Sequence, residues 1–346
     1  MTTVLESLQA ALEHALSCDP RVIVLGEDIL DPYGGAFKVT RGLSTKYPDR
    51  ILTTPVSEAG IVGVATGMAL RGLKPVVEIM FGDFLTLAAD QLINHAAKLR
   101  WVYDDRVRAP IVVRTPMGGR RGYGPTHSQS LEKLFLGVPG LQVLAPAAFG
   151  DPGGLLEKAI LEDDDPVLFV ENKLLYLLPI FQPGSQNDLD LAELTPGNTL
   201  SRAAQGAKHS GYPIYHLAVR SAPPPDLTMV AYGYMAELCR QVLLRLAYEE
   251  EIFSELFIPT QLAPFKLEPV LESARRTGSL LVVEEGSLTL GWGAEVLARA
   301  SETLGPSLRS ARRVAAFDLP IPAAVTLESV VLPGPDDIFN AAKSIL

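Results

Sequence analysis

The segment best suited to chemistry carries one carboxylate at the start of a run of small residues. Residues 54–67 read Thr-Pro-Val-Ser-Glu-Ala-Gly-Ile-Val-Gly-Val-Ala-Thr-Gly, and Glu58 is their one charged side chain. Gly60, Gly63 and Gly67 would leave a helix almost bare, so that another backbone can pack closely against it. Glu58 would then lie in a poorly hydrated junction, where desolvation raises the pKa of a carboxyl group. On spacing alone, an exposed Glu58 that favours the positive end of a helix explains the pattern equally well.

Two further candidates are aromatic or titratable. Phe84 opens an apolar helical stretch, and its flat ring can either orient a flat heterocycle or pack in a core. His127 lies in the loop 124–130, Gly-Pro-Thr-His-Ser-Gln-Ser, which is a suitable platform for a group that titrates near neutral pH. Arg120 and Arg121 precede it, and they either steer an anionic substrate, pair with a partner subunit or remain solvated.

Other kinds of site are excluded. The glycine patterns lack a complete dinucleotide fingerprint or phosphate loop, and no HExxH or clustered His and Cys set suggests a catalytic metal. With 30 basic and 40 acidic residues the net charge is −10, which disfavours nucleic acid and anionic lipid. Without an apolar run long enough for a membrane span or a basic flank typical of a signal peptide, we expect a cytoplasmic protein.

Alternating strands and helices would position these residues. We expect an amphipathic helix over 3–17, further helices over 58–70, 84–99 and 151–161, and short buried parallel strands between them. The expected strands are 21–25, 51–54, 75–80, 110–114, 141–144 and 166–170. The class is therefore α/β, with a mostly parallel sheet.

The length of 346 residues predicts two domains. We expect an N-terminal domain over 1–178, a linker rich in Pro, Gly, Ser and Asn over 179–225, and a smaller α/β domain over 226–346. The second domain has expected strands at 228–232, 280–283 and 314–317, with helices at 235–247 and 294–300.

Several motifs together resemble a known family. They are Gly26-Glu27-Asp28, the run from Tyr33 to Leu43, the Ser57-Glu58-Ala59-Gly60 helix start, Phe84 with Asp90-Gln91 and Asn94, the loop around His127, Glu171-Asn172, and Val282 to Gly286. The chain resembles the beta subunits of pyruvate, branched-chain 2-oxoacid and acetoin dehydrogenases, within the transketolase-like superfamily. Because the motifs extend through both domains, the resemblance covers nearly the whole chain.

This resemblance implies roles for individual residues. Glu58 would bond the aminopyrimidine ring nitrogen of thiamine diphosphate and so promote formation of its reactive carbon. Ser57 and Phe84 would join Glu58 in cofactor binding, with Phe84 stacked on the ring. His127 would lie near the thiazolium and handle a proton or the substrate carboxylate.

His95 is expected in the core or at an interface, whereas His14, His209 and His216 are expected to be solvated or in the linker.

The resemblance also implies partners. The family binds the diphosphate through Mg²⁺ and a GDG motif, but Gly82-Asp83-Phe84 has Phe in place of the last Gly and lies in the wrong region. An alpha subunit would therefore supply the Mg²⁺ half in an α2β2 heterotetramer with a beta–beta contact, and a lipoyl acyltransferase core is a further expected partner. A potassium ion is expected at main-chain carbonyls around Leu161, Asp164 and Asp165.

The expected activity is decarboxylation of a 2-oxoacid and transfer of the acyl group to a lipoyl or similar carrier. Two alternatives remain open at this point: a transketolase-like carboligase or acyloin-cleaving enzyme subunit, and a non-catalytic scaffold for an alpha subunit.

Overall fold

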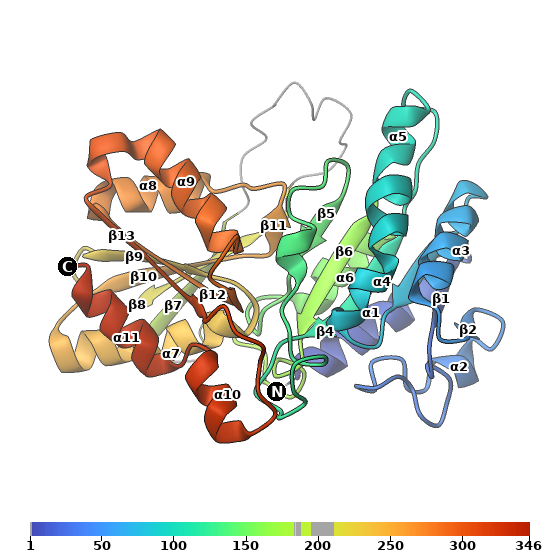
Figure 1. The fold of residues 1–346 in the computed structure, drawn as a ribbon, viewed down its shortest axis with the longest axis horizontal. Coiled ribbons are helices and arrows are strands. Elements are labelled where there is room, and N and C mark those ends of the chain that lie inside the picture. The colour runs from blue at the N-terminus through green and yellow to red at the C-terminus, as the bar shows by residue number, and fades with distance from the viewer. Residues whose placement is uncertain (1, 183, 185–187, 195–210) are drawn as a thin grey trace. The chain divides into compact units, whose positions relative to one another are not determined.

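The chain forms two compact units, each built as an α/β layered structure, which confirms the predicted fold class. The structure is a computed structural model that describes residues 2–182, 184, 188–194 and 211–346 (Figure 1). The first unit comprises Met1–Gly118, Gln129–Pro146 and Asp151–Ile180, and the second comprises Gly119–Ser128, Ala147–Gly150 and Phe181–Leu346.

A parallel sheet forms the centre of the first unit. Its strands are β1 (Val22–Gly26), β2 (Ile51–Thr53), β3 (Lys74–Glu78), β4 (Val112–Met117), β5 (Gln142–Leu144) and β6 (Val167–Asn172). They lie in the order β5-β6-β4-β3-β1-β2, and every neighbouring pair among them is parallel. Most of the strand residues are buried because helices cover the sheet.

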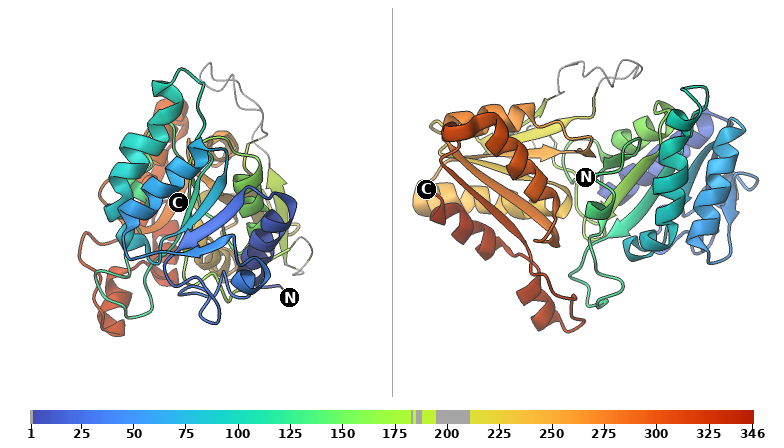
Figure 2. Two further views of the ribbon diagram at one scale, coloured as in Figure 1. Left: turned by 90° about the vertical axis from the view of Figure 1, so that its right-hand side faces the viewer. Right: turned by 45° about the horizontal axis from the view of Figure 1, so that its top comes forward.

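Amphipathic sequence accounts for the helices of this unit. In α1 (Val4–Cys18) the stripe of Val4, Leu8, Leu12 and Leu16 is buried, and Thr3 and Glu6 form a capping box. The helix α6 (Pro152–Leu161) starts with Asp151, whose side chain accepts a bond from the Gly154 amide. It packs against α1, while α3 (Glu58–Leu70) packs against α4 (Leu85–Asp90), so helices cover both faces of the sheet (Figures 1 and 2).

The helix expected over 84–99 is interrupted. A 3-10 turn (Gly82–Phe84) precedes α4, and a π-helical turn (Gln91–His95) and a second 3-10 turn (Ala96–Lys98) separate α4 from α5 (Leu99–Val102). Apolar spacing predicted the whole stretch as one regular helix and did not indicate the change to π and 3-10 hydrogen bonding. A further short helix, α2 (Leu43–Lys46), follows β1.

The second unit contains a mixed sheet. Its strands are β7 (Leu189–Leu194), β8 (Ile214–Val219), β9 (Leu227–Ala231), β10 (Ser254–Pro259), β12 (Ser279–Ser287) and β13 (Ser310–Ala316), in the order β13-β12-β9-β10-β8-β7. β8 is antiparallel to both β7 and β10, whereas the other pairs are parallel. A short strand β11 (Gln261–Ala263) follows β10.

Two pairs of helices pack on this sheet. They are α7 (Gly233–Glu250) with α11 (Pro335–Ser344), and α8 (Glu268–Thr277) with α9 (Trp292–Leu304). The shorter α10 (Val325–Val331) precedes α11. The core between α7 and the sheet includes Cys239, Val242 and Leu246.

The segment expected to be a linker contributes to this sheet. Within residues 179–225, β7 and β8 form an antiparallel pair in which Leu191 lies opposite Leu217. The surrounding Pro, Gly and Ser residues obscured these strands in the sequence. His209 lies outside the described residues.

Candidate functional site

The carboxyl ends of three neighbouring strands bring the first candidates to one edge of the sheet. In the parallel register Gly26 of β1 lies opposite both Thr53 of β2 and Glu78 of β3, so the three strands end at the same level. Glu27 follows β1 directly, while Glu58 and Phe84 begin or precede the helical segments that follow β2 and β3. This edge is where open α/β sheets bind ligands.

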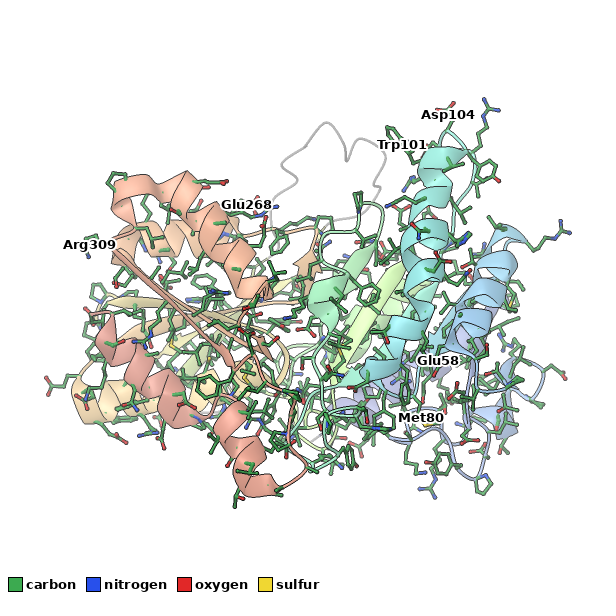
Figure 3. All side chains as sticks on the ribbon, viewed as in Figure 1. Glu58, Met80, Trp101, Asp104, Glu268 and Arg309 are labelled. Atoms are coloured by element: carbon green, nitrogen blue, oxygen red, sulfur yellow. The ribbon has the colours of Figure 1, made fainter. Side chains whose placement is uncertain are left out.

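Glu58 is a buried acid with exposed neighbours. It is the first residue of α3 and only 5% exposed, while Ser57, Ala59 and Gly60 are exposed. Figure 3 shows Glu58 at the start of α3, and Glu268, which opens α8 in the same helical position but is exposed. The alternative of an exposed carboxylate at a helix start therefore holds for Glu268 and fails for Glu58.

The outer face of α3 is not covered by the described part of this chain. A side-chain carbon added at Gly67 would meet no atom within 4 Å, and one added at Gly60 would meet only Ser57 within that distance. Val64 and Leu70 on the same helix are 61% and 47% exposed. This face can therefore accept another backbone at close range.

Glu27, which directly follows β1, is a further candidate at this edge of the sheet. Its side chain is buried, and its Oε1 atom has no hydrogen-bond partner among the described residues. Burial and the negative charges of Glu58 and Asp28 raise the pKa of Glu27, whereas the Ser57 amide opposes this rise. The signal in the sequence was its place two residues after the strand expected over 21–25.

Phe84 belongs to a group of aromatic rings. It is half-buried, and its ring lies edge-on to that of Phe81 with 6.1 Å between centroids. Phe81 in turn lies edge-on to Phe37 at 5.7 Å, and Phe37 stacks on Tyr176 at 5.3 Å. Phe84 thus has a packing role, and its exposed part leaves its role in cofactor stacking as a prediction.

A buried ion network lies at the ends of β3, β4 and β6. Arg114 donates to both oxygens of Glu171 at 2.8 and 2.6 Å and also bonds Glu78, and Tyr176 donates to Glu171 at 2.6 Å. Burial raises the pKa of Glu78, and Arg114 opposes that rise. Two carboxylates are thereby held inside the unit by one guanidinium. Sequence reasoning missed this network because its members are distant in the chain.

Asp83 has a structural role. It is buried, and its Oδ1 atom accepts bonds from the main-chain and side-chain nitrogens of Gln129 at 3.3 and 2.8 Å. A side-chain carbon at Gly82 would lie 2.2 Å from the Met117 side chain, so this glycine allows close packing. The Gly82-Asp83-Phe84 segment thus serves the fold of the first unit.

His127 belongs to the second unit, whereas Glu58, Ser57 and Phe84 belong to the first. It is half-buried, and its Nδ1 atom lies 3.0 Å from the Thr126 hydroxyl. Arg120, in the same loop, donates to the Pro333 carbonyl at 2.5 Å, and its Nε lies 3.6 Å from a Glu285 oxygen. Its guanidinium is therefore engaged within the second unit.

The three residues of the expected potassium site have protein partners. The Leu161 carbonyl accepts a bond from the Lys74 ammonium at 2.5 Å, and the Ile160 carbonyl accepts another at 3.0 Å. Asp165 bonds Arg100, and Asp164 lies 4.0 Å from Arg108. A positive charge thus already lies at the Leu161 carbonyl, and the potassium ion stays a prediction.

The remaining histidines have simple roles. His95 is exposed, with 3.5 Å between its Nε2 atom and an Asp90 carboxylate oxygen, and His14 is exposed beside Glu157. His216 is bonded to the buried Glu255 at 2.7 Å, so the expectation of a solvated residue was wrong because it lies on β8 rather than in a linker.

Over the described ranges there is no group of three or more His, Cys, Asp or Glu side chains that could hold a metal ion. Within the same ranges no helix is long and apolar enough to cross a membrane.

Comparison with protein families matches both units of the chain. Residues 1–178 match the transketolase pyrimidine binding domain, and residues 217–338 match the transketolase C-terminal domain. A solved split-gene transketolase, described as an inactive beta4 tetramer, shares the fold with a TM-score of 0.75 at 21% identity, and the alignment covers 100% of this chain and 99% of the other.

Curated relatives extend over nearly the whole chain. The pyruvate dehydrogenase E1 component subunit beta-1 of Arabidopsis thaliana is 37% identical over 99% of this chain and 88% of its own length. The 2-oxoisovalerate dehydrogenase subunit beta of Pseudomonas aeruginosa is 35% identical over 99% and 95%. The acetoin:2,6-dichlorophenolindophenol oxidoreductase subunit beta of Cupriavidus necator is 33% identical over 98% and 96%. Because the plant relative is described as mitochondrial, a cytoplasmic location stays a prediction. The chain belongs to the family of 2-oxoacid dehydrogenase E1 beta subunits.

Proposed function

We propose that this chain is the beta half of a thiamine-diphosphate-dependent enzyme that decarboxylates a 2-oxoacid and transfers the acyl group to a lipoyl or similar carrier. The observation that carries the proposal is a buried acid, Glu58, at the head of a helix face that the described part of this chain leaves bare. A family match that includes a pyrimidine binding domain over residues 1–178 supports it.

The residues at the sheet edge fit the pyrimidine half of this cofactor. Glu58 and Glu27 bring two buried carboxyl groups to the edge, and one oxygen of Glu27 has no partner among the described residues. Phe84 is a partly exposed aromatic side chain after the neighbouring strand. An acid that can share a proton with a ring nitrogen and an aromatic face that can orient a ring are what a flat aminopyrimidine requires.

Each residue then has a distinct task. When bound, thiamine diphosphate supplies the nucleophilic carbon that the protein itself lacks. Glu58 holds a proton toward the pyrimidine, with Ser57 beside it at the helix start. Glu27 adds a second buried carboxyl group whose charge interacts with that of Glu58, and Phe84 limits the orientations that the ring can adopt. His127, on its glycine-rich loop, provides an imidazole that can donate or accept a hydrogen bond.

A second chain completes the proposed site. Asp83 is already bonded to Gln129, so we assign Mg²⁺ and the diphosphate to an alpha subunit that packs on the bare face of α3 in an α2β2 heterotetramer. The proposal also includes the beta–beta contact and docking on a lipoyl acyltransferase core. Lys74 supplies a positive charge at the Leu161 carbonyl, where the potassium ion is expected.

One relative favours a second candidate, an acetoin-cleaving activity on the same half-site. That relative is the Cupriavidus necator subunit, which is described as acting on acetoin with an artificial electron acceptor. The two candidates differ in whether the bond broken beside the oxo carbon releases carbon dioxide or an aldehyde.

A substrate screen tests the proposal. The chain is purified with its alpha subunit, and reduction of 2,6-dichlorophenolindophenol is measured with pyruvate, with branched-chain 2-oxoacids and with acetoin. We expect reduction with a 2-oxoacid that requires both chains, thiamine diphosphate and Mg²⁺. Reduction with acetoin alone would favour the second candidate, and activity that needs neither this chain nor the cofactor would refute both.

A further inference from the structure

The loop that carries His127 is held by a distant carboxylate. Glu328 lies on α10, and it is only 2% exposed. Its Oε1 atom accepts a bond from the Arg120 amide at 2.8 Å, and its Oε2 atom accepts one from the Gly122 amide at 3.1 Å. Both oxygens of a buried acid are therefore used to fix the backbone of one loop, about 200 residues earlier in the sequence.

A second carboxylate extends this contact. The Gly119 amide donates to Glu285 at 2.9 Å, so three amides between Gly119 and Gly122 bond to two buried acids. Arg120 adds its guanidinium bond to the carbonyl of Pro333, two residues after the end of α10. Hydrogen bonds to charged acceptors are among the stronger ones in proteins, and buried donors that lose them are costly.

The backbone of the loop is shaped for this contact. Arg120, Gly122 and Gly124 all have positive φ, at 67°, 66° and 78°. A side-chain carbon at Gly119 would lie 2.5 Å from the Leu332 side chain, and one at Gly122 would lie 3.0 Å from the Ala323 carbonyl. The loop thus lies close to both ends of α10, and its conformation depends on packing and hydrogen bonds from this helix and the residues that flank it.

We propose that Glu328 is a positioning residue for His127: by holding the Arg120 and Gly122 amides, it fixes the loop in the conformation from which His127 acts. The inference rests on the proposed function, since it assumes that His127 takes part in turnover. The Glu328 carboxylate bonds the Arg120 and Gly122 amides of the loop, and it acts through His127 rather than on substrate.

Glu328→Gln is the sharpest perturbation. It retains the size of the side chain and one oxygen, but it turns the other acceptor into an NH₂ group that faces a backbone donor. We expect amide hydrogen exchange across residues 119–128 to rise about tenfold or more, because one bond to a charged acceptor is lost. Exchange in α7 and α9 of the same unit should remain at the wild-type rate. Glu295→Gln, an exposed acid on α9 that pairs with Arg299, is the matched control and should alter neither region.

Kinetics of the assembled enzyme separate positioning from general stability. His127→Ala, Glu328→Gln and the double variant are compared in kcat and in KM for the 2-oxoacid. If Glu328 acts through His127, Glu328→Gln lowers kcat about tenfold, and the double variant is no slower than His127→Ala alone. Losses that multiply in the double variant, or loop exchange at the wild-type rate in Glu328→Gln, would overturn the inference. Wild-type kcat in His127→Ala would instead refute the catalytic role of His127 in the proposed function, and the exchange result would still decide whether Glu328 fixes the loop.

Discussion

Replacing Arg114 with Met should destabilise the first unit strongly, by about 3–5 kcal/mol at pH 7. Arg114 makes two bonds to Glu171 and one to Glu78, and both acids are almost completely buried. Met has similar length and no charge, so the variant leaves two carboxylates inside the unit without their cation. The cost comes from those uncompensated charges rather than from lost packing.

The dependence on pH provides the signature of this mechanism. Burial already raises the pKa of Glu78 against the effect of Arg114, and removal of Arg114 raises it further. A carboxyl whose pKa is higher in the folded state than the unfolded value of about 4.3 loses stability as pH rises from that value to the folded one. The deficit of Arg114→Met should therefore be smallest near pH 4 and grow by up to about 1.4 kcal/mol per pH unit for each acid that keeps its proton.

Denaturant unfolding at a series of pH values measures both quantities. The control is Arg299→Met, which breaks an exposed pair with Glu295 and should cost about 0.5 kcal/mol or less. A deficit for Arg114→Met below about 1 kcal/mol at pH 7, or one that stays constant from pH 4 to pH 7, would refute the reasoning.

Three other perturbations test separate parts of the structure. Glu27→Gln removes an acid whose pKa is raised, so the melting temperature of the variant should exceed that of the wild type at pH 7 and approach it near pH 4. An equal difference at both pH values would contradict a pKa of Glu27 raised by burial and by the charge of Glu58. Lys74→Met should lower the free energy of unfolding by about 1–3 kcal/mol, because the Ile160 and Leu161 carbonyls lose their donor. A variant with wild-type stability would contradict this role of Lys74. Gly67→Arg should leave the melting temperature of the isolated chain close to that of the wild type but abolish co-purification with the alpha subunit. Gly72→Arg is not a suitable control, because Gly72 has positive φ. A heterotetramer of Gly67→Arg at wild-type yield would show that the bare face of α3 is not the interface with the alpha subunit.

The regular elements around Glu58 could be predicted because local pattern determines them. The helix expected over 58–70 has those bounds in the structure, and the first unit alternates strand and helix as the short apolar runs indicated. The strand expected over 110–114 instead covers Val112–Met117, because Arg114 was taken as its end. A buried arginine inside a strand requires acids on neighbouring strands, and that pairing is not local in sequence.

The residues of the candidate site also fall into two groups: those found from sequence motifs and those that only the structure reveals. Glu58 and His127 were found from motifs, and the burial of Glu58 distinguishes it from Glu268 only in the structure. Glu27 became a candidate because its pKa is raised in part by the charge of Glu58. Glu328 became one because it bonds amides about 200 residues away in the sequence. These contacts join residues that are far apart in the sequence, so they cannot be predicted from composition or from the periodicity of a single element.

The most direct test of the account compares Glu58→Gln with Glu268→Gln in the assembled enzyme. Both residues open a helix, but one is buried at the sheet edge and the other is exposed. The account predicts that Glu58→Gln assembles with the alpha subunit, unfolds near the wild-type midpoint and loses about 100-fold or more in kcat, while Glu268→Gln keeps full activity. A Glu58→Gln enzyme that turns over its 2-oxoacid at the wild-type rate would contradict the central claim.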